Sequence, residues 1–195
     1  MNIKQPFSTS DRTDSPVSLY AATKKSNELI AFSYSHLFKI PCTGLRFFTV
    51  YGPYGRPDMA YYKFAKSIDK GEKIDVYNNG NMKRDFTYID DIIKGLKRVM
   101  YEVPNEMPSK YSSAEAPSRV LNIGNNNPVT LLEFIQAIEA SLGKKADKNF
   151  LPMQPGDVPS TYADIDDLVD LVGFKPKTSI DDGMKNFINW FQGNK

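Results

Sequence analysis

A tyrosine and a lysine four positions apart, Tyr20 and Lys24, are the residues of this sequence whose types and spacing best suit catalysis. Residues at this spacing lie on one face of an α-helix, so the lysine ammonium can lie near the phenol and favour its ionised form. An ionised tyrosine can act as a general base near neutral pH and remove the proton of an alcohol. The spacing alone is weak evidence, because Tyr62 and Lys66 repeat it.

A helix and a strand are predicted to position this pair. Apolar residues recur at helical intervals over residues 16–38, and prolines stand at the start of this segment and just after its end. Residues 42–50 form an almost continuous apolar and β-favouring run, which is typical of a buried parallel strand. Residues 1–15 have the polar composition of a loop, so order is expected to begin at Pro16.

The rest of the chain alternates helical patterns with short buried strands. Asp90 is the expected N-cap of one helix, and Thr130 with Glu133 forms a capping box at the start of another. Residues 102–119 contain three prolines and are predicted to be a long surface excursion. Such alternation predicts an α/β fold with a largely parallel sheet. The expected helices cover residues 59–70, 91–101, 130–142 and a C-terminal segment from Ser179, and the expected strands cover residues 73–77 and 119–123.

Composition limits the class of protein. With 41% hydrophobic and 25% charged residues, the chain has the balance of an ordinary globular protein. A formal net charge of +2 predicts neither a nucleic acid nor a membrane as partner. The single cysteine, Cys42, excludes an internal disulfide, and the sequence has no apolar membrane span or leader, so a cytoplasmic location is expected. His36 has no other ligand residue at metal-binding spacing, so no metal site is expected.

Several segments together resemble the C-terminal part of the extended short-chain dehydrogenase/reductase family, and most closely its UDP-glucuronate 4-epimerases. The resemblance implies the C-terminal part of a Rossmann-like parallel-sheet domain, formed by residues 1–50 and 87–125. It also implies a smaller α/β lobe that binds the sugar nucleotide, formed by residues 51–86 and 126–195. The segments that carry the resemblance are residues 16–24, 45–56, 83–91 and 121–124, and Pro155-Gly-Asp157 with Tyr162-Ala-Asp164.

The resemblance implies that Tyr20 and Lys24 are catalytic and contact NAD. Tyr20 would remove the proton of the sugar 4-hydroxyl while hydride passes to NAD, and the 4-keto sugar would then turn over and take the hydride back. Lys24 would hold the cofactor ribose. The chain contains no glycine-rich G-x-x-G-x-x-G or G-x-G-x-x-G motif to bind the NAD pyrophosphate. The chain alone is therefore expected neither to bind NAD tightly nor to epimerise sugar nucleotides.

Two further residues point to an acidic sugar. Relatives that act on neutral hexoses usually have asparagine at the position of Thr49, whereas the uronate epimerases resemble this chain at Thr49 and Arg56. A hydroxyl can donate to a carboxylate, and a guanidinium can bind two anionic oxygens at once. The alternative interpretations are a β-branched residue at a strand end for Thr49 and a solvated loop charge for Arg56.

The resemblance also implies contacts to the nucleotide. Arg84 matches the arginine that binds phosphate, and the helix that begins near Ala60 offers free amides to the same group. Asp157 matches the residue that bonds the ribose hydroxyls, although a simple Pro-Gly-Asp turn is the alternative. Val76 and Tyr77 belong to the segment that lines the uracil.

Other functions stay open at this point. A UDP-glucuronate decarboxylase and a sugar-nucleotide 4,6-dehydratase also begin by oxidising C4 of the sugar. A module that binds UDP-sugars without catalysis is a third possibility, because the nucleotide-binding residues are present. Family members usually form homodimers through the helix that carries the catalytic tyrosine, so a homodimer is expected for the full-length protein.

Overall fold

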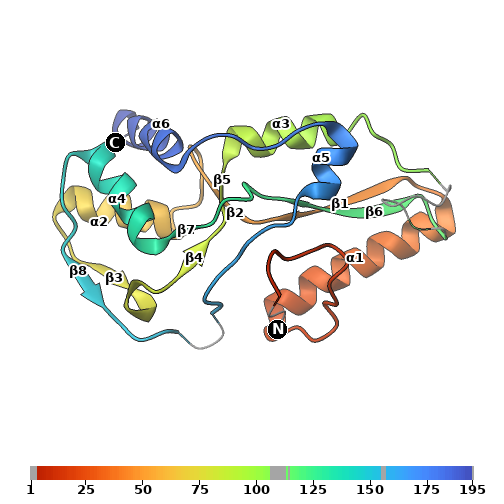
Figure 1. Ribbon diagram of the computed structural model, residues 1–195, viewed down its shortest axis with the longest axis horizontal. Helices are drawn as coiled ribbons and strands as arrows, with labels where there is room; N and C mark the ends of the chain where they lie inside the picture. Colours follow the sequence, from red (N-terminus) through yellow and green to blue (C-terminus); the bar gives the residue numbers. More distant parts are fainter. Residues whose placement is uncertain (1–3, 106–112, 114, 155–156, 195) are drawn as a thin grey trace.

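The computed structural model describes residues 4–105, 113, 115–154 and 157–194 (Figure 1). Residues 106–112 and 114 of the predicted excursion over residues 102–119 therefore lie outside the described residues, as do Pro155 and Gly156 of the Pro-Gly-Asp motif. The helices are α1 (Leu19–Phe38), α2 (Ala60–Lys70), α3 (Ile89–Val99), α4 (Leu131–Leu142), α5 (Asp166–Val172) and α6 (Ile180–Gly193), with a 3₁₀ helix at Tyr77–Gly80. The strands are β1 (Cys42–Phe47), β2 (Thr49–Tyr51), β3 (Ile74–Val76), β4 (Lys83–Arg84), β5 (Phe86–Tyr88), β6 (Ser118–Ile123), β7 (Val129–Thr130) and β8 (Lys148–Phe150).

The strands of the described residues form pairs, and most of these pairs are parallel. The pairs β1–β6, β2–β5 and β3–β8 are parallel, whereas β4 and β7 are antiparallel. Helix α1 packs on one side of the β1–β6 pair, and α3 and α5 lie on the other side (Figure 1). This mixed α/β architecture with parallel strand pairs agrees with the predicted fold class.

The predicted single strand over residues 42–50 is wrong, because the chain divides at Phe48 into two strands. Strand β1 pairs with β6 along its whole length, from Cys42 opposite Ser118 to Phe47 opposite Ile123. Strand β2 instead pairs with β5, which approaches from a different part of the chain. Both strands are rich in β-favouring residues, so their composition does not reveal the change of partner.

The segment before α1 is tied to the rest of the molecule well before Pro16. Phe7 forms a parallel bridge with Ala163, and the Phe7 carbonyl accepts hydrogen bonds from Asp164 N at 3.0 Å and Asn122 Nδ2 at 2.8 Å. The expectation that order begins at Pro16 is therefore wrong. A single bridging residue leaves no periodic pattern in the sequence, and its partners lie more than 100 residues away.

Helix starts follow local chemistry at most of the expected positions. The side chain of Ser179 accepts from Asp182 N at the start of α6, and Thr130 and Glu133 form the predicted reciprocal capping box of α4. The expected cap of α3 is wrong, because this helix begins at Ile89 and Asp90 lies inside its first turn. An acidic residue there still favours the helix dipole, which explains the similar sequence signal.

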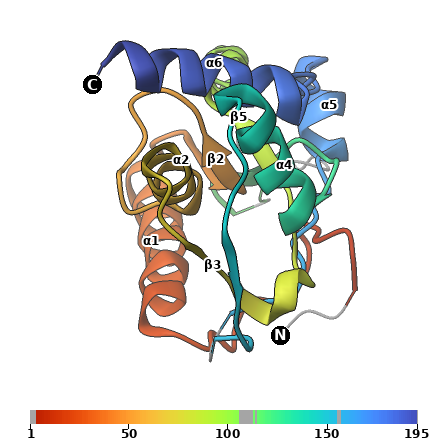
Figure 2. The ribbon, with the colours of Figure 1, turned by 90° about the vertical axis from the view of Figure 1, so that its left-hand side faces the viewer.

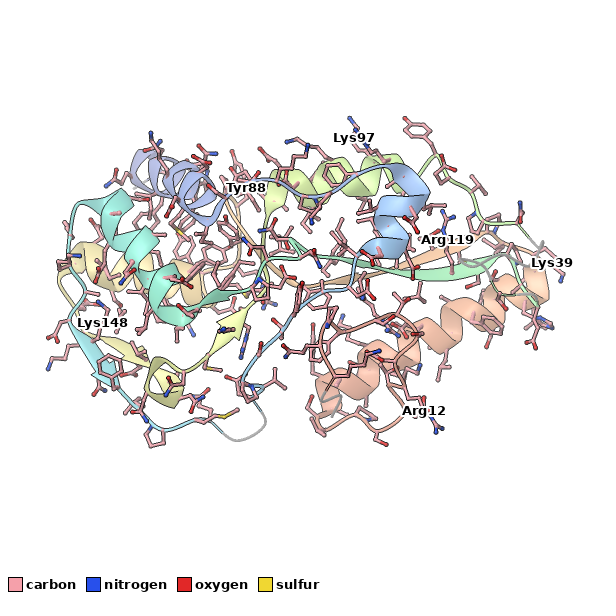
Figure 3. The ribbon with its side chains drawn as sticks, viewed as in Figure 1. Arg12, Lys39, Tyr88, Lys97, Arg119 and Lys148 are labelled. Carbon is pink, nitrogen blue, oxygen red and sulfur yellow. The ribbon has the colours of Figure 1, made fainter. Side chains whose placement is uncertain are left out.

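Two separate hydrophobic cores organise the molecule. The larger one lies among α2, α4 and α6, which surround it in Figure 2. Its buried aromatic residues are Tyr51, Tyr61, Phe86, Tyr88, Phe134, Phe187 and Phe191. The smaller core combines β6 and α3 with α5. The family resemblance had assigned the residues of α5 to the smaller lobe instead. Tyr88 lies near α6, at the end of the strand that leads into α3 (Figure 3).

Candidate functional site

A cleft of about 1720 Å³ lies beside the start of α1 and contains four of the predicted site residues. Its walls come from the segment before α1, the first turns of α1, the C-terminal end of β1, strand β2 and the loop over residues 52–56. The predicted residues that line it are Tyr20, Lys24, Thr49 and Arg56. The structure thus brings together the predicted base, its lysine and both residues predicted to recognise an acid.

The predicted catalytic pair, Tyr20 and Lys24, lies in the first turns of α1. The Ser18 hydroxyl caps this helix by accepting from Ala21 N at 3.1 Å, which fixes where its helical geometry begins. The Lys24 Nζ atom lies over the ring of Tyr20, 5.3 Å from the ring centroid. Tyr20 is 72% exposed, so its phenol is open to a ligand in the cleft. The other Tyr/Lys pair differs, because Tyr62 packs against Phe187 in the larger core.

Thr49 and Arg56 occupy different environments in the cleft. Thr49 is the first residue of β2 and pairs with Phe86, so its backbone is fixed by the sheet. The Arg56 side chain is 75% exposed, and its Nε atom lies 3.3 Å from the Asp58 carboxylate. An ion pair this exposed contributes little stability, so the guanidinium can exchange Asp58 for another anion at small cost.

A constrained loop connects these two residues. Gly52 has a φ of +143°, and a Cβ atom at this position would lie 2.5 Å from Ile89 Cγ2, so only glycine fits. The Tyr61 hydroxyl lies 3.4 Å from the Gly52 carbonyl and donates to it. Burial raises the pKa of Tyr61, which keeps this hydroxyl protonated as a donor. The loop is therefore held against α2 and α3 at the base of the cleft.

Arg84 and Asp157 form a direct ion pair at the border of the cleft. The Arg84 Nη2 atom lies 2.7 Å from Asp157 Oδ1, and the two side chains are 18% and 35% exposed. Neither residue lines the cleft, but Val158, the next residue after Asp157, does. The residues predicted to bind phosphate and ribose thus contact each other, beside the cleft that contains the predicted catalytic pair.

The remaining predicted contacts come from α2 and β3. Ala60 is the exposed first residue of α2, and Met59 before it makes no side-chain cap hydrogen bond. The amide of Tyr62 donates to the Met59 carbonyl at 3.1 Å, which leaves the first two amides of α2, those of Ala60 and Tyr61, for an anion. The Val76 side chain is fully buried in the larger core, so any contact of this residue with a base comes from its backbone. Tyr77 is half-buried at the start of the 3₁₀ helix.

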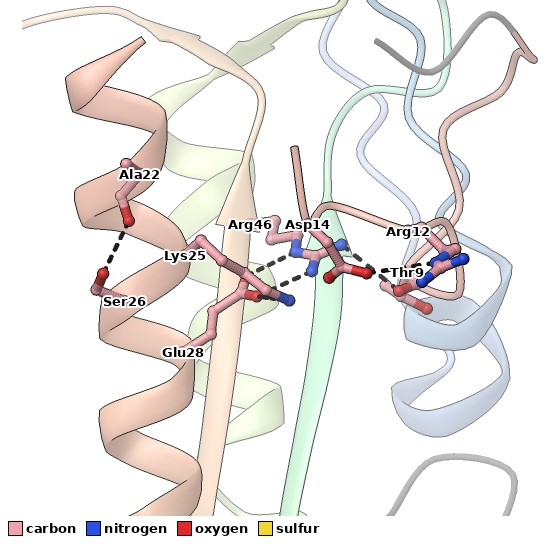
Figure 4. Close-up of polar contacts among 8 residues, drawn as sticks. All are labelled: Thr9, Arg12, Asp14, Ala22, Lys25, Ser26, Glu28 and Arg46. Carbon is pink, nitrogen blue, oxygen red and sulfur yellow. Dashed lines mark hydrogen bonds and ion pairs between the residues drawn. The ribbon is translucent and has the colours of Figure 1, made fainter. Parts of the chain in front are cut away.

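Sequence reasoning missed a bidentate ion pair that anchors α1 to the sheet (Figure 4). Arg46 on β1 donates to both carboxylate oxygens of Glu28 on α1, at 2.7 and 3.0 Å. These hydrogen bonds, with the charges of Arg46 and Lys25, hold the pKa of Glu28 below its usual range despite its partial burial. Glu28 follows Lys24 by one more helical step of four, which was the available signal.

The described residues give no sign of a metal centre or a membrane helix. Among residues 4–105, 113, 115–154 and 157–194, no cluster of three His, Cys, Asp or Glu residues could bind a metal. His36 instead lies with Nδ1 2.8 Å from the Glu115 carbonyl. In the same part of the chain, no helix combines the length and apolar character needed to cross a bilayer.

Comparisons with known proteins identify relatives across almost the whole chain. The model of the NAD dependent epimerase/dehydratase family matches residues 3–124. Protein CapI of Staphylococcus aureus is 56% identical over 197 residues, which cover 97% of this chain and 59% of that protein. The probable UDP-glucuronate 4-epimerase of Rhizobium meliloti (strain 1021) is 50% identical over 200 residues, with 99% and 59% coverage. The chain thus spans about six-tenths of the length of these relatives.

Solved structures agree with the sequence relatives. UDP-glucuronic acid 4-epimerase from Bacillus cereus, in complex with UDP-glucuronic acid and NAD, superposes with a TM-score of 0.80 at 34% identity. That match covers 93% of this chain and 55% of the solved chain. UDP-N-acetylglucosamine 4-epimerase from Methanobrevibacter ruminantium M1, in complex with UDP-N-acetylmuramic acid, superposes with a TM-score of 0.85 at 27% identity, covering 100% and 59%. The chain belongs to the NAD dependent epimerase/dehydratase family.

Proposed function

We propose that this chain supplies the catalytic Tyr/Lys pair and the sugar-nucleotide pocket of an NAD-dependent UDP-glucuronate 4-epimerase. The observation that carries the proposal is that Tyr20, Lys24, Thr49 and Arg56 line the same cleft. Relatives whose names give this activity, and a solved relative that holds UDP-glucuronic acid and NAD, support the same assignment. In this proposal the two lobes are those that the family resemblance implies, residues 1–50 with 87–125 and residues 51–86 with 126–195, except that α5 packs with β6 and α3 of the first.

Tyr20 is the proposed base for the sugar 4-hydroxyl. Its Oη atom would take the hydroxyl proton, and Lys24, whose ammonium lies over the Tyr20 ring, would hold the cofactor ribose. Both side chains are exposed at the cleft wall, so they fit the nicotinamide riboside end of NAD. When bound, NAD supplies the hydride acceptor and donor at C4. The chain's own residues hold the sugar and move the proton.

The acid and the nucleotide are proposed to bind through separate residues. Thr49 would donate to the sugar carboxylate, and Arg56 would leave Asp58 for a substrate anion. Arg84, with the first amides of α2 near Ala60, would neutralise the diphosphate. Asp157 would accept from the ribose hydroxyls, and the backbone of Val76 and the side chain of Tyr77 would line the uracil.

A chimera tests the proposal. The part of the Rhizobium meliloti relative that precedes its match to this chain would be fused to residues 1–195 and supplied with NAD and UDP-glucuronate. Conversion to UDP-galacturonate, abolished by Tyr20→Phe, supports the proposal. Formation of UDP-xylose with carbon dioxide would instead assign a decarboxylase, and a folded chimera without turnover would contradict a catalytic role. The chain without its fusion partner is expected to be inactive.

A binding module without catalysis is the second candidate, and the Arg84–Asp157 ion pair favours it, because this pair forms without any cofactor-binding half. A calorimetric titration of the chain with UDP, in the absence of NAD, separates the two functions. Micromolar binding together with a catalytically silent chimera would favour the module. Turnover by the chimera would favour the epimerase whatever the affinity of the chain alone.

A further inference from the structure

We propose that Asp85 is a positioning residue that fixes how Arg84 and Asp157 are placed relative to each other and to Thr49. The assignment of Arg84 and Asp157 to the nucleotide rests on the proposed function, whereas the role of Asp85 in orienting them does not. Asp85 has no access to solvent and does not line the cleft. It acts through the three segments that its hydrogen bonds join.

The carboxylate of Asp85 accepts hydrogen bonds from backbone amides of two distant segments. Its Oδ1 lies 2.9 Å from Asn125 N, and its Oδ2 lies 3.1 Å from Asn126 N and 2.9 Å from Ala163 N. The first two amides belong to the turn after β6, and the third belongs to the segment that begins at Asp157. One side chain therefore fixes the distance between these segments.

The backbone of Asp85 adds two further connections. Its amide donates to Thr161 Oγ1 at 3.1 Å, and its carbonyl accepts from Thr49 N at 3.1 Å. Asp85 thus joins the first residue of β2 to the segment over residues 157–163. Since Arg84 directly precedes Asp85, the orientation of its side chain depends on the same backbone.

Backbone hydrogen bonds of Lys83 also fix the chain next to Arg84. Lys83 N donates to the Pro159 carbonyl at 2.9 Å, and Thr161 N donates to the Lys83 carbonyl at 3.1 Å. These bonds place the segment after Asp157 alongside β4, and on a third side, at the turn over residues 124–127, Asn126 Nδ2 donates to the Ala163 carbonyl at 2.8 Å. At the same turn, the Asp85 carboxylate adds its hydrogen bonds from Asn125 N, Asn126 N and Ala163 N.

The chemistry of the site requires an acceptor of this type. Several amide donors converge on the carboxylate, and burial raises its pKa although these hydrogen bonds oppose the increase. An asparagine has one acceptor oxygen, and its amide group would face the remaining N–H groups as a donor. Asp85→Asn therefore leaves buried amides without an acceptor, which displaces the segments that they belong to.

Asp91 offers a matched control, because it is also a buried carboxylate that accepts from backbone amides. It is 4% exposed, and its Oδ2 accepts from Lys177 N at 3.0 Å and Thr178 N at 2.8 Å. These bonds tie α3 to the segment before α6 and touch neither Arg84 nor Asp157. Asp91→Asn removes a comparable set of bonds at another place.

The first experiment needs no ligand. In the 195-residue chain, the guanidinium NMR signals of Arg84 report the ion pair, and amide exchange reports Asn125, Asn126 and Ala163. The expected result for Asp85→Asn is loss of the protected Arg84 signal and about tenfold faster exchange of the three amides, with both retained in Asp91→Asn. Thr161→Val, a milder change, is expected to weaken the Arg84 signal in a folded protein. An unchanged Arg84 signal in Asp85→Asn, or its equal loss in Asp91→Asn, would overturn the proposal.

A UDP titration then tests the consequence for binding. Asp85→Asn is expected to weaken UDP binding at least about tenfold, and Asp91→Asn to leave it unchanged. Equal UDP affinity of Asp85→Asn and the wild type would overturn the positioning role. Absence of UDP binding by both the wild-type chain and the chimera would contradict the nucleotide pocket of the proposed function instead, and the ligand-free Arg84 signal would still decide the role of Asp85.

Discussion

Arg84 and Asp157 are 73 positions apart in the sequence, yet Arg84 Nη2 lies 2.7 Å from Asp157 Oδ1. In the proposed function the two residues bind different parts of a sugar nucleotide, Arg84 the diphosphate and Asp157 the ribose. Their mutual ion pair keeps both side chains in place before any ligand arrives. Binding would then exchange one set of charge-assisted hydrogen bonds for another, so little reorganisation is needed.

Replacing Arg84 by methionine is predicted to weaken UDP binding. A hydrogen bond to a charged group contributes about 1.5–3 kcal/mol, so the dissociation constant should rise about 10- to 100-fold. Isothermal titration with UDP measures this change. Arg98→Met is the control, because Arg98 donates to the carbonyls of Val172 and Gly173 at the end of α5. Equal losses in both variants would exclude a specific phosphate contact.

The two Tyr/Lys pairs are predicted to respond differently to loss of the tyrosine hydroxyl. In the active chimera, Tyr20→Phe should lower kcat about 10²- to 10⁴-fold, the usual contribution of a general base. Tyr62→Phe should leave kcat nearly unchanged, because Tyr62 packs against the core of α2 and α6. A steady-state assay of both variants checks this. Similar kcat values for wild type and Tyr20→Phe would remove Tyr20 from the mechanism.

Breaking the Glu28–Arg46 ion pair is predicted to weaken the attachment of α1 to β1. Both side chains are about three-quarters buried, so Glu28→Gln should lower the free energy of unfolding by about 1–2 kcal/mol. Asp14→Asn provides the control, because the Arg12–Asp14 pair is largely exposed, and Arg12 lies at the surface beside α1 (Figure 3). Urea unfolding measures both. A larger loss for Asp14→Asn would contradict the anchoring role.

Glu139 is predicted to make stability depend on pH. Burial tends to raise its pKa, but hydrogen bonds from Lys148, Ala146 N and Lys145 outweigh burial and lower the pKa from 4.5 to about 2. A lowered folded-state pKa stabilises the protein above pH 4.5, and this contribution is lost as the pH falls towards about 2. The shift corresponds to at most about 3 kcal/mol.

Urea unfolding at several pH values between 6 and about 3 checks this prediction. Glu139→Gln should be less stable than the wild type near neutral pH, and the difference should shrink as the pH falls below 4.5. A difference that stays constant over this range would mean that the charge of Glu139 contributes nothing to stability.

Local patterns predicted the helices, since their signals lie within a few residues of each other. The framing prolines indicated α1, and the Thr130 capping box and Ser179 cap fixed the starts of α4 and α6. The seven residues of α5 are too few for a periodic pattern, and this helix was not predicted. The bridge from Phe7 to Ala163 depends on long-range pairing that no local pattern records.

The same distinction applies to the site. Tyr20 and Lys24 are neighbours on one helix turn, so their proximity follows from spacing alone. The Arg84–Asp157 contact follows only from the folded chain, although the family resemblance pointed to each residue separately. The sequence did not point to Asp85, because its carboxylate accepts from backbone amides, which any residue type except proline can provide.

The most direct test of the central claim uses UDP-glucuronate deuterated at C4 in the chimera with bound NAD. If Tyr20 removes the hydroxyl proton while hydride leaves and returns to C4, the product is UDP-galacturonate that keeps its deuterium. Mass spectrometry of the product measures both properties at once. Loss of the deuterium to solvent, or release of carbon dioxide in place of epimerisation, would contradict the account.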